Sequence, residues 1–244
     1  RRHADDVRFA TIARRMGALL PLAPAETEFL LRVGSGPASL WAPKSLIDHP
    51  RAEHAPSRYI ISGWAAHIRE LQDGRRQIVQ VLLPGDALMP QLQVRDRRQT
   101  VQCLTMVQTV DAAAIRLAAR DPEKFPGIAA AVQLAAANER GFMLEQVTRL
   151  GRQTAYERVA SLFIELHYRC LPVGLVHDNG FAFPLTQEGI GDALGLSVVH
   201  VNRTLQLMRQ QNLITLRQGR LVLHDIPALQ VAAEFRPPAP ERVS

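Results

Sequence analysis

The stretch that decides the fold runs from Phe183 to His224 and reads FPLTQEGIGDALGLSVVHVNRTLQLMRQQNLITLRQGRLVLH. Thr186 can cap a helix over 187–194, because its hydroxyl can accept a backbone amide hydrogen of the first turn. Gly195 can leave that helix with a positive φ, and Ser197 can cap a second helix. The stretch therefore predicts a helix, a tight turn and a second helix.

The second helix, expected over 197–210, separates its residues by face at about 100° per residue. The side that we expect to pack holds Val201, Thr204, Leu205 and Met208. The side that is free to contact a partner holds Val199, Asn202, Arg203 and Gln206, with His200 at its edge. No acidic residue occurs between Ser197 and His224. Because amide and guanidinium groups make paired hydrogen bonds to purine edges and phosphates, this face indicates DNA binding.

A small hairpin is predicted after the second helix. The runs 213–216 and 221–223 are strand-like, and the four residues Arg217-Gln218-Gly219-Arg220 join them. Such a hairpin holds Arg217 and Arg220 at its tip, where a DNA-binding wing contacts phosphates. The preceding segment, 171–183, reads as a loop or short hairpin.

The whole stretch resembles the winged helix-turn-helix of the Crp/Fnr family of bacterial transcription regulators. The match runs without a gap from Thr186 to Arg203 and includes LGLS (194–197) and VNRTLQ (201–206). The resemblance implies that base edges are contacted by Val198, Val199, His200, Asn202 and Arg203. It also implies that phosphates lie near Thr186, Gln187 and Ser197. The family usually has Glu where this chain has Val199, and a valine offers only apolar contact, for instance to a thymine methyl group.

Between Ala38 and Asp111, short apolar runs alternate with turn residues, which predicts a small antiparallel β-barrel or jelly roll. Asp73-Gly74 is a two-residue hairpin signal within it. Before this region, one or two short helices are expected over 7–31, the second beginning near Pro24. SGWAA (62–66), LQDGRRQIVQVLLPGD (71–86) and CLTMVQTVD (103–111) resemble the sensory barrel of the same family, and the likeness covers most of residues 38–115.

The resemblance also bears on a ligand. Pro84-Gly85-Asp86 stands where family members that bind cyclic AMP carry a Gly-Glu pair. Their Arg-Ser-Ala phosphate segment is replaced here by Arg97-Arg98-Gln99-Thr100, which lacks the small residues that let the backbone approach a phosphate. We expect Arg95, Arg97 and Arg98 to form a solvated loop. The sensory region is therefore not expected to depend on cyclic AMP, and its ligand is unknown.

Cofactors and metals are not expected. Two cysteines, Cys103 and Cys170, are too few for an iron–sulfur cluster and lack zinc-site spacing. For Cys103 a buried, inert thiol is favoured over a redox role. His49, His54 and His67 are candidate haem ligands by residue type alone, and each is more often a surface or core-edge histidine.

A long helix is expected over 125–150, with an apolar stripe of Val132, Ala136, Met143, Val147 and Leu150. The family resemblance implies that this helix pairs with its twin in a parallel homodimer, and the alternative is packing on its own barrel. Two-fold symmetry fits a palindromic operator. We expect Gly151 to interrupt the helix and mark a domain boundary, after which helical spacing resumes from Ala155.

The chain has 244 residues, of which 47% are hydrophobic, and a net charge of +6, which favours a polyanionic partner. No apolar run approaches the roughly 18 residues of a membrane helix. Near the start, a charge-then-apolar run is too short and too broken by Pro21 and Pro24 for a secretion signal. The cysteine usage fits a reducing cytoplasm. Because the chain begins with Arg rather than Met, we expect a few residues or a tag to precede it.

We therefore expect an α+β protein. Its domains would be a sensory barrel with N-terminal helices (1–120), a dimerisation helix (121–150), a winged helix-turn-helix (151–235) and a disordered tail (236–244). The sequence lacks the GxSxG, Walker, GxGxxG and HExxH motifs, and His167 and Cys170 are expected to pack rather than form a nucleophile. The expected function is a cytoplasmic, non-enzymatic, homodimeric transcription regulator that binds DNA and contacts RNA polymerase. The alternative is a ligand-sensing or interaction module whose winged helix contacts protein.

Overall fold

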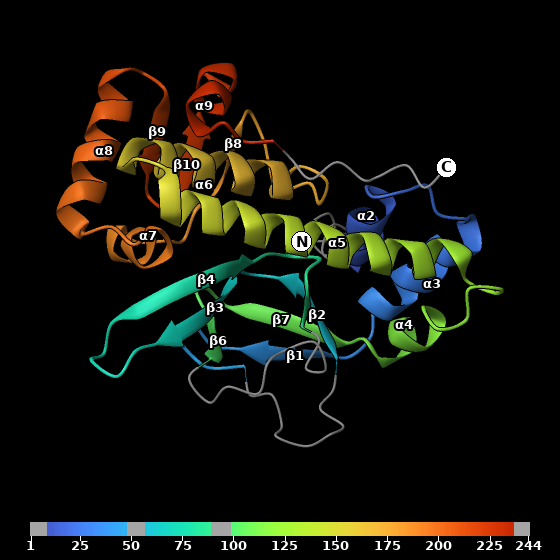
Figure 1. Cartoon of the computed structure of the whole chain (residues 1–244). Helices are drawn as coiled ribbons and strands as arrows, with labels where there is room; N and C mark the ends of the chain where they lie inside the picture. The colour runs from blue at the N-terminus through green and yellow to red at the C-terminus, as the bar shows by residue number, and fades with distance from the viewer. Residues whose placement is uncertain (1–8, 48–56, 89–98, 237–244) are drawn as a thin grey trace. The chain divides into compact units, whose positions relative to one another are not determined.

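The computed structural model describes residues 9–47, 57–88 and 99–236. Two compact units are present: described residues up to His67 and from Val81 to Glu139 form the first, and Ile68–Gln80 with the described residues from Arg140 onward form the second. Figure 1 shows the helices and strands of the chain. The predicted tail lies, apart from Arg236, outside the described residues.

Two short helices open the described chain, α2 (Thr11–Gly17) and α3 (Pro24–Gly34), as the sequence predicts. Pro24 is compatible with the first turn of α3, because a helix leaves the first amide groups unpaired and proline has no amide hydrogen. The helix α4 (Ala113–Ala118) follows the strands. These helices pack with the first residues of α5 (Pro126–Arg152) over one apolar cluster that includes Ile12, Leu30, Ile115 and Ile128.

The β-region confirms the α+β prediction. One sheet has the strand order β1 (Ala38–Trp41), β7 (Val107–Asp111), β2 (Arg58–Ser62) and β5 (Ala87–Leu88), and its neighbouring strands are antiparallel. The other has the order β4 (Arg76–Leu82), β3 (Ala65–Glu70) and β6 (Gln99–Cys103). Side chains of both sheets share one core of Ile47, Ile60, Ala65, Leu82, Leu88, Val101, Cys103 and Val107. The described strands thus form two sheets with a common core rather than one closed barrel.

The hairpin predicted at Asp73-Gly74 is present, but its loop is longer than two residues. β3 ends at Glu70 and β4 begins at Arg76, so five residues connect them. The Leu71 amide donates to the Arg75 carbonyl at 2.8 Å, and Gly74 has a φ of 83°. The Asp73 carboxylate accepts the Arg75 amide hydrogen at 3.0 Å, which stabilises a wider turn than the Asp-Gly pair alone predicts.

The long helix α5 corrects the prediction that Gly151 interrupts it. α5 continues through Gly151 to Arg152, and the next helix, α6 (Ala155–Cys170), begins after Thr154. The Thr154 hydroxyl accepts the Glu157 amide hydrogen at 3.4 Å while the Glu157 carboxylate accepts the Thr154 amide hydrogen at 2.8 Å. This capping box fixes the start of α6, so the break lies at Gln153-Thr154.

The second unit is built around α6, most of which is buried. It packs against α7 (Gln187–Leu194), α8 (Val198–Gln210) and α9 (Ile226–Ala233). A three-stranded sheet completes the unit, with the order β8 (Gly180–Ala182), β10 (Arg220–Leu223) and β9 (Ile214–Arg217). Strand β8 falls within the segment predicted as a loop or short hairpin. Its Phe181 packs against Phe183, which also packs against Phe163.

Candidate nucleic-acid interface

The helix-turn-helix forms as the sequence predicts. The Thr186 hydroxyl accepts the Gly189 amide hydrogen at 3.1 Å and caps α7. Gly195 ends α7 with a φ of 62°, and the Ser197 hydroxyl accepts the His200 amide hydrogen at 3.3 Å to cap α8. A Cβ atom at Gly191 would lie 2.6 Å from the Leu196 carbonyl oxygen, so glycine is needed for the turn to close against α7.

The two faces of α8 are separated as expected. Its packed face is buried, and the relative exposures of Val201, Thr204, Leu205 and Met208 are 0%, 6%, 0% and 0%. The opposite face is open, and Val199 is 60% exposed. α7 and α8 lie beside each other in the second unit, and β9 lies against α8 (Figure 1). Buried packing on one side therefore holds the polar side of α8 outward.

Most of the predicted contact residues lie at the start of this open face. The exposed ones are Thr186, Ser197, Val198, Val199, His200 and Arg203. Gln187 and Asn202 are half-buried, and their side-chain amides are 3.4 Å apart in a hydrogen bond. The His200 ring Nδ1 lies 2.9 Å from the Ser197 hydroxyl. The helix starts therefore bring amide, hydroxyl, imidazole and guanidinium groups onto one surface.

The two wing arginines differ. The turn between β9 and β10 places Gln218 and Gly219 at φ values of 49° and 71°, as a tight hairpin requires. Arg217 and Arg220 are both exposed. The Arg220 guanidinium donates to the His177 carbonyl at 2.7 Å, which ties it back to the loop before β8.

Comparison with known proteins identifies the family. Residues 157–232 match the Crp-like helix-turn-helix domain. The chain is 31% identical over 166 residues to the nitrogen fixation regulation protein FixK of Azorhizobium caulinodans. It is 30% identical over 171 residues to the transcriptional activator protein FnrL of Cereibacter sphaeroides. This chain belongs to the Crp/Fnr family of transcription regulators.

The matched stretch covers 67% of this chain in both cases, and 65% of FixK and 66% of FnrL. The chain thus spans just under two thirds of the length of these relatives. The solved structure of FixK2 from Bradyrhizobium japonicum has a TM-score of 0.67 at 24% identity, covering 82% of this chain and 98% of its own. A CRP-family transcriptional regulator from Thermus thermophilus has a TM-score of 0.60 at 21% identity, with coverages of 82% and 99%. These structures confirm the predicted Crp/Fnr fold.

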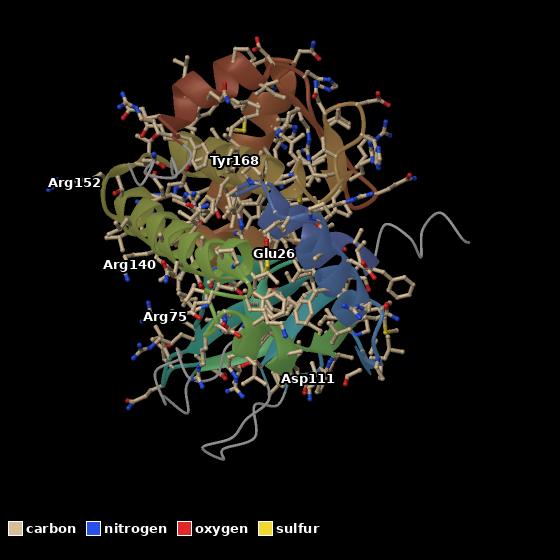
Figure 2. The ribbon with its side chains drawn as sticks, turned by 90° about the vertical axis from the view of Figure 1, so that its right-hand side faces the viewer. Glu26, Arg75, Asp111, Arg140, Arg152 and Tyr168 are labelled. Carbon is tan, nitrogen blue, oxygen red and sulfur yellow. The ribbon has the colours of Figure 1, made fainter. Side chains whose placement is uncertain are left out.

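The residues of the apolar stripe predicted for dimerisation in this Crp/Fnr chain differ in their exposure to solvent along α5. Val132 is half-buried against the apolar cluster of the first unit, whereas Ala136 is exposed. Met143 and Val147 are 36% and 67% exposed, and Leu150 is half-buried. Leu144, which lies outside the predicted stripe, is 63% exposed, and Arg140 projects outward from the same helix (Figure 2).

In the region predicted to be sensory, other residues of the chain bind the Asp86 carboxylate. Its carboxylate accepts the Leu83 amide hydrogen at 2.8 Å and lies 3.3 Å from the Arg15 guanidinium. Arg15 also donates to the Pro84 carbonyl at 3.1 Å. Burial raises the pKa of the neighbouring Tyr59, and the Asp86 charge adds to that effect. Asp86, which stands where family members that bind cyclic AMP carry a Gly-Glu pair, is therefore part of an ion pair within the protein.

The other residues that could contact a ligand or haem by residue type, none of them favoured by the sequence, are only partly described by the structure. His67 is half-buried on β3. Arg95, Arg97, Arg98, His49 and His54 lie outside the described residues. Cys103 is buried, and burial raises the pKa of its thiol, which disfavours the reactive thiolate. Within residues 9–47, 57–88 and 99–236, no group of three or more His, Cys, Asp or Glu side chains is arranged to hold a metal ion. Nor does that part of the chain contain a helix long and apolar enough to cross a membrane.

The sequence did not predict the side chains that form hydrogen bonds to the ends of α7 and α8. Arg158 donates to the Leu194 carbonyl at 2.9 Å, and Gln146 donates to the Ala193 carbonyl at 2.7 Å. Tyr156 donates to Gln211, just after α8, at 2.7 Å. These partners are separated by 36, 47 and 55 residues, and no local pattern links them.

Proposed function

We propose that this protein is a homodimeric transcription regulator that reads a palindromic DNA operator with α8 in the major groove. The observation that carries the proposal is the acid-free outer face of α8, on which the exposed His200 and Arg203 and the half-buried Asn202 follow a capped turn. Such groups bind base edges and phosphates. The matched Crp-like domain supports the same assignment.

Within this proposal, Arg203 reads bases and Arg217 contacts phosphate. Both side chains are exposed, but Arg203 lies on the open face of α8, whereas Arg217 lies at the wing. A residue that contacts base edges contributes to preference between sequences, whereas one that contacts phosphate contributes equally to all sequences. Thr186, Gln187 and Ser197 are proposed as phosphate contacts at the helix starts, with Val198, Val199 and Asn202 at the bases.

The homodimer is proposed from α5. Met143, Leu144 and Val147 expose apolar side chains on adjacent turns of one helix, and Ala136 continues this surface. A second copy of α5 would cover them, and two α8 helices would then read two half-sites about one helical turn apart. We further propose a cytoplasmic location, RNA polymerase as a partner and a sensory domain at 1–120 that does not depend on cyclic AMP. The Arg15–Asp86 pair supports the last point.

The test is selection of genomic DNA fragments by the purified protein, followed by binding measurements on the selected operator. Arg203→Ala should weaken binding by about 1–3 kcal/mol and relax base preference, while Arg217→Ala should weaken binding to all sequences equally. Arg209→Ala, at an exposed position near the end of α8, is the control. An Arg203→Ala variant that keeps its base preference would contradict the role assigned to Arg203.

Self-association is measured on the same samples by sedimentation. Val147→Asp should shift the protein to monomer and abolish cooperative binding to paired half-sites. Val231→Asp is the matched control, because Val231 lies on α9 and is 80% exposed. Added cyclic AMP should change neither the melting temperature nor the DNA affinity.

A further inference from the structure

The carboxyl end of α7, where the chain turns toward α8, is held by side chains from three other segments of the second unit. Helix ends leave their last carbonyl groups without partners inside the helix. Here the Ala193 carbonyl accepts from Gln77 at 3.1 Å and from Gln146 at 2.7 Å, while the Leu194 carbonyl accepts from Arg158 at 2.9 Å. We call Gln77, Gln146 and Arg158 the α7 end cluster.

Gln146 has a fixed orientation in this cluster. Its amide oxygen accepts a hydrogen bond from the Arg149 guanidinium, 2.6 Å away, so its amide nitrogen must face the Ala193 carbonyl. Arg149 is only 2% exposed and donates to Ser161 at 3.0 Å and to Glu165 at 2.6 Å. A continuous chain of hydrogen bonds therefore runs from α6 through α5 to the end of α7.

The segment 68–80, which forms most of the β3–β4 hairpin, also contacts the carboxyl end of α7. Next to Gln77, the Arg76 guanidinium forms an ion pair with Asp192 on α7 at 2.8 Å. The neighbouring Arg75 differs, because it binds Asp73 at 2.8 Å within the hairpin, is 76% exposed and points outward (Figure 2). Because β3 and β4 continue beyond this segment into the first unit, the hairpin offers a route by which a change in that unit would reach α7.

We propose that the α7 end cluster positions α8 for DNA reading and thereby sets the spacing between half-sites that the dimer prefers. The proposal rests on the proposed function. α8 begins four residues after Leu194, and the turn between them is closed by Gly191, Gly195 and Leu196, so a shift of the α7 end moves the start of α8. Gln77, Gln146 and Arg158 are positioning residues, since their side chains bind protein carbonyls and act through α7.

Gln146→Glu separates positioning from packing. The new carboxylate still accepts from Arg149 but has no hydrogen to donate to the Ala193 carbonyl. Full-length protein is tested on the selected operator and on versions in which the distance between half-sites changes by one base pair at a time. We expect roughly three- to tenfold weaker binding at the original spacing, the scale of one net hydrogen bond. We also expect a changed ranking of spacings with unchanged base preference inside each half-site.

Gln133→Glu is the control, because it makes the same charge change at an exposed position of α5. Gln77→Ala provides a second variant, and its effect combined with Gln146→Glu should be non-additive because both glutamines share one acceptor. If both variants rank the half-site spacings as the wild type does, this inference is wrong and the proposed function still stands. That holds whether the DNA affinity of the variants falls equally at all spacings or does not change. A wild-type protein that selects no DNA, or has no spacing preference, overturns the proposed function and this inference with it.

Discussion

The two ends of α5 are each tied to a buried carboxylate, but by different donors. At the amino end, Glu26 is 4% exposed and accepts backbone hydrogens from Ala23 and Ile128, each at 3.0 Å. At the carboxyl end, Glu165 is 6% exposed and accepts from the guanidinium groups of Arg149 at 2.6 Å and Arg169 at 3.0 Å. Glu26 therefore pairs with helix-start amides, which carry partial charges, and Glu165 pairs with two full charges.

This difference decides what is left behind when each acid is removed. Loss of Glu26 leaves two amide hydrogens without their acceptor. Loss of Glu165 leaves two buried cations, since Arg149 and Arg169 are only 2% and 4% exposed. A buried charge without its partner costs several kcal/mol, whereas an unpaired amide costs less. The carboxyl end of α5 should thus be the more sensitive of the two.

The largest effect is therefore expected for Glu165→Ala, which should lower the free energy of unfolding by about 3–5 kcal/mol. Denaturant unfolding measures the loss, and hydrogen exchange of α6 amides locates it in the second unit. Glu188→Ala, at an exposed position on α7, is the control. Unfolding that is no more affected by Glu165→Ala than by the control would mean that the remaining contacts of the two arginines compensate for the lost carboxylate.

At the other end, Glu26→Gln should cost less, about 2–3 kcal/mol, because one of its two acceptor atoms becomes a donor facing an amide hydrogen. Trp41 and Trp64 both lie in the first unit, so tryptophan fluorescence follows its thermal unfolding. Glu28→Gln, on the exposed side of α3, changes the same charge without touching α5. An equal loss in both variants would show that Glu26 does not hold the start of α5.

Two glycines of α5 sharpen the same comparison. A Cβ atom at Gly127 would collide with the Glu26 carboxylate, whereas a Cβ atom at Gly151 would meet nothing within 4 Å. Gly127→Ala should therefore destabilise the first unit by about 1–2 kcal/mol through crowding. Gly151→Ala should stabilise the helix by about 0.5–1 kcal/mol, because alanine loses less backbone entropy than glycine. Thermal unfolding of both variants and the wild type measures these changes, and the melting temperature should fall for Gly127→Ala and rise for Gly151→Ala.

The helix-turn-helix was predictable because its signals are local. Thr186, Gly195 and Ser197 each act within four residues of their own position, through a cap or a positive φ. The alternation of buried and open positions on α8 likewise follows from helical period alone. In such stretches the residue types and their spacing are sufficient to predict the structure, and the Crp/Fnr resemblance agreed with them.

The remaining features depend on partners far away in the sequence. Asp86 binds Arg15 across 71 positions, and Gln146 binds a carbonyl 47 residues later. Gly151 is a case in which a local signal was misleading. A glycine predicts the end of a helix only when no stronger boundary signal lies nearby in the sequence. Here the capping box at Thr154 sets the boundary, and α5 extends past the glycine. A sequence pattern indicates the structure that one segment prefers. It does not indicate which hydrogen-bond or ion-pair partners a distant segment supplies.

Another buried ionisable side chain, His167, completes the comparison and should give the smallest effect. It is 6% exposed, its Nε2 has no hydrogen-bond partner within the described part of the chain, and its ring lies 6.0 Å from that of Phe181. Burial lowers the pKa of His167 below its ordinary value of 6.5. The unfolded chain therefore takes up a proton as pH falls below 6.5 while the folded protein does not, so stability decreases in that range. Above it, this contribution to stability is fully present.

Replacing His167 by Leu removes the titrating group and should flatten the decrease in melting temperature as the pH falls below 6.5, where the unfolded chain takes up a proton that the folded protein does not. Cys170→Ala is the matched variant, because Cys170 is buried one turn further along α6. Its cavity should lower the melting temperature similarly at pH 5 and pH 7.5. A His167→Leu variant whose melting temperature keeps the wild-type pH slope would assign that slope to other groups. Glu26 and Glu165 are buried together with their hydrogen-bond donors. Protonation of His167 in the folded protein would instead place a charge in a buried ring whose Nε2 has no hydrogen-bond partner among the described residues, so burial sets the sign of its pH dependence.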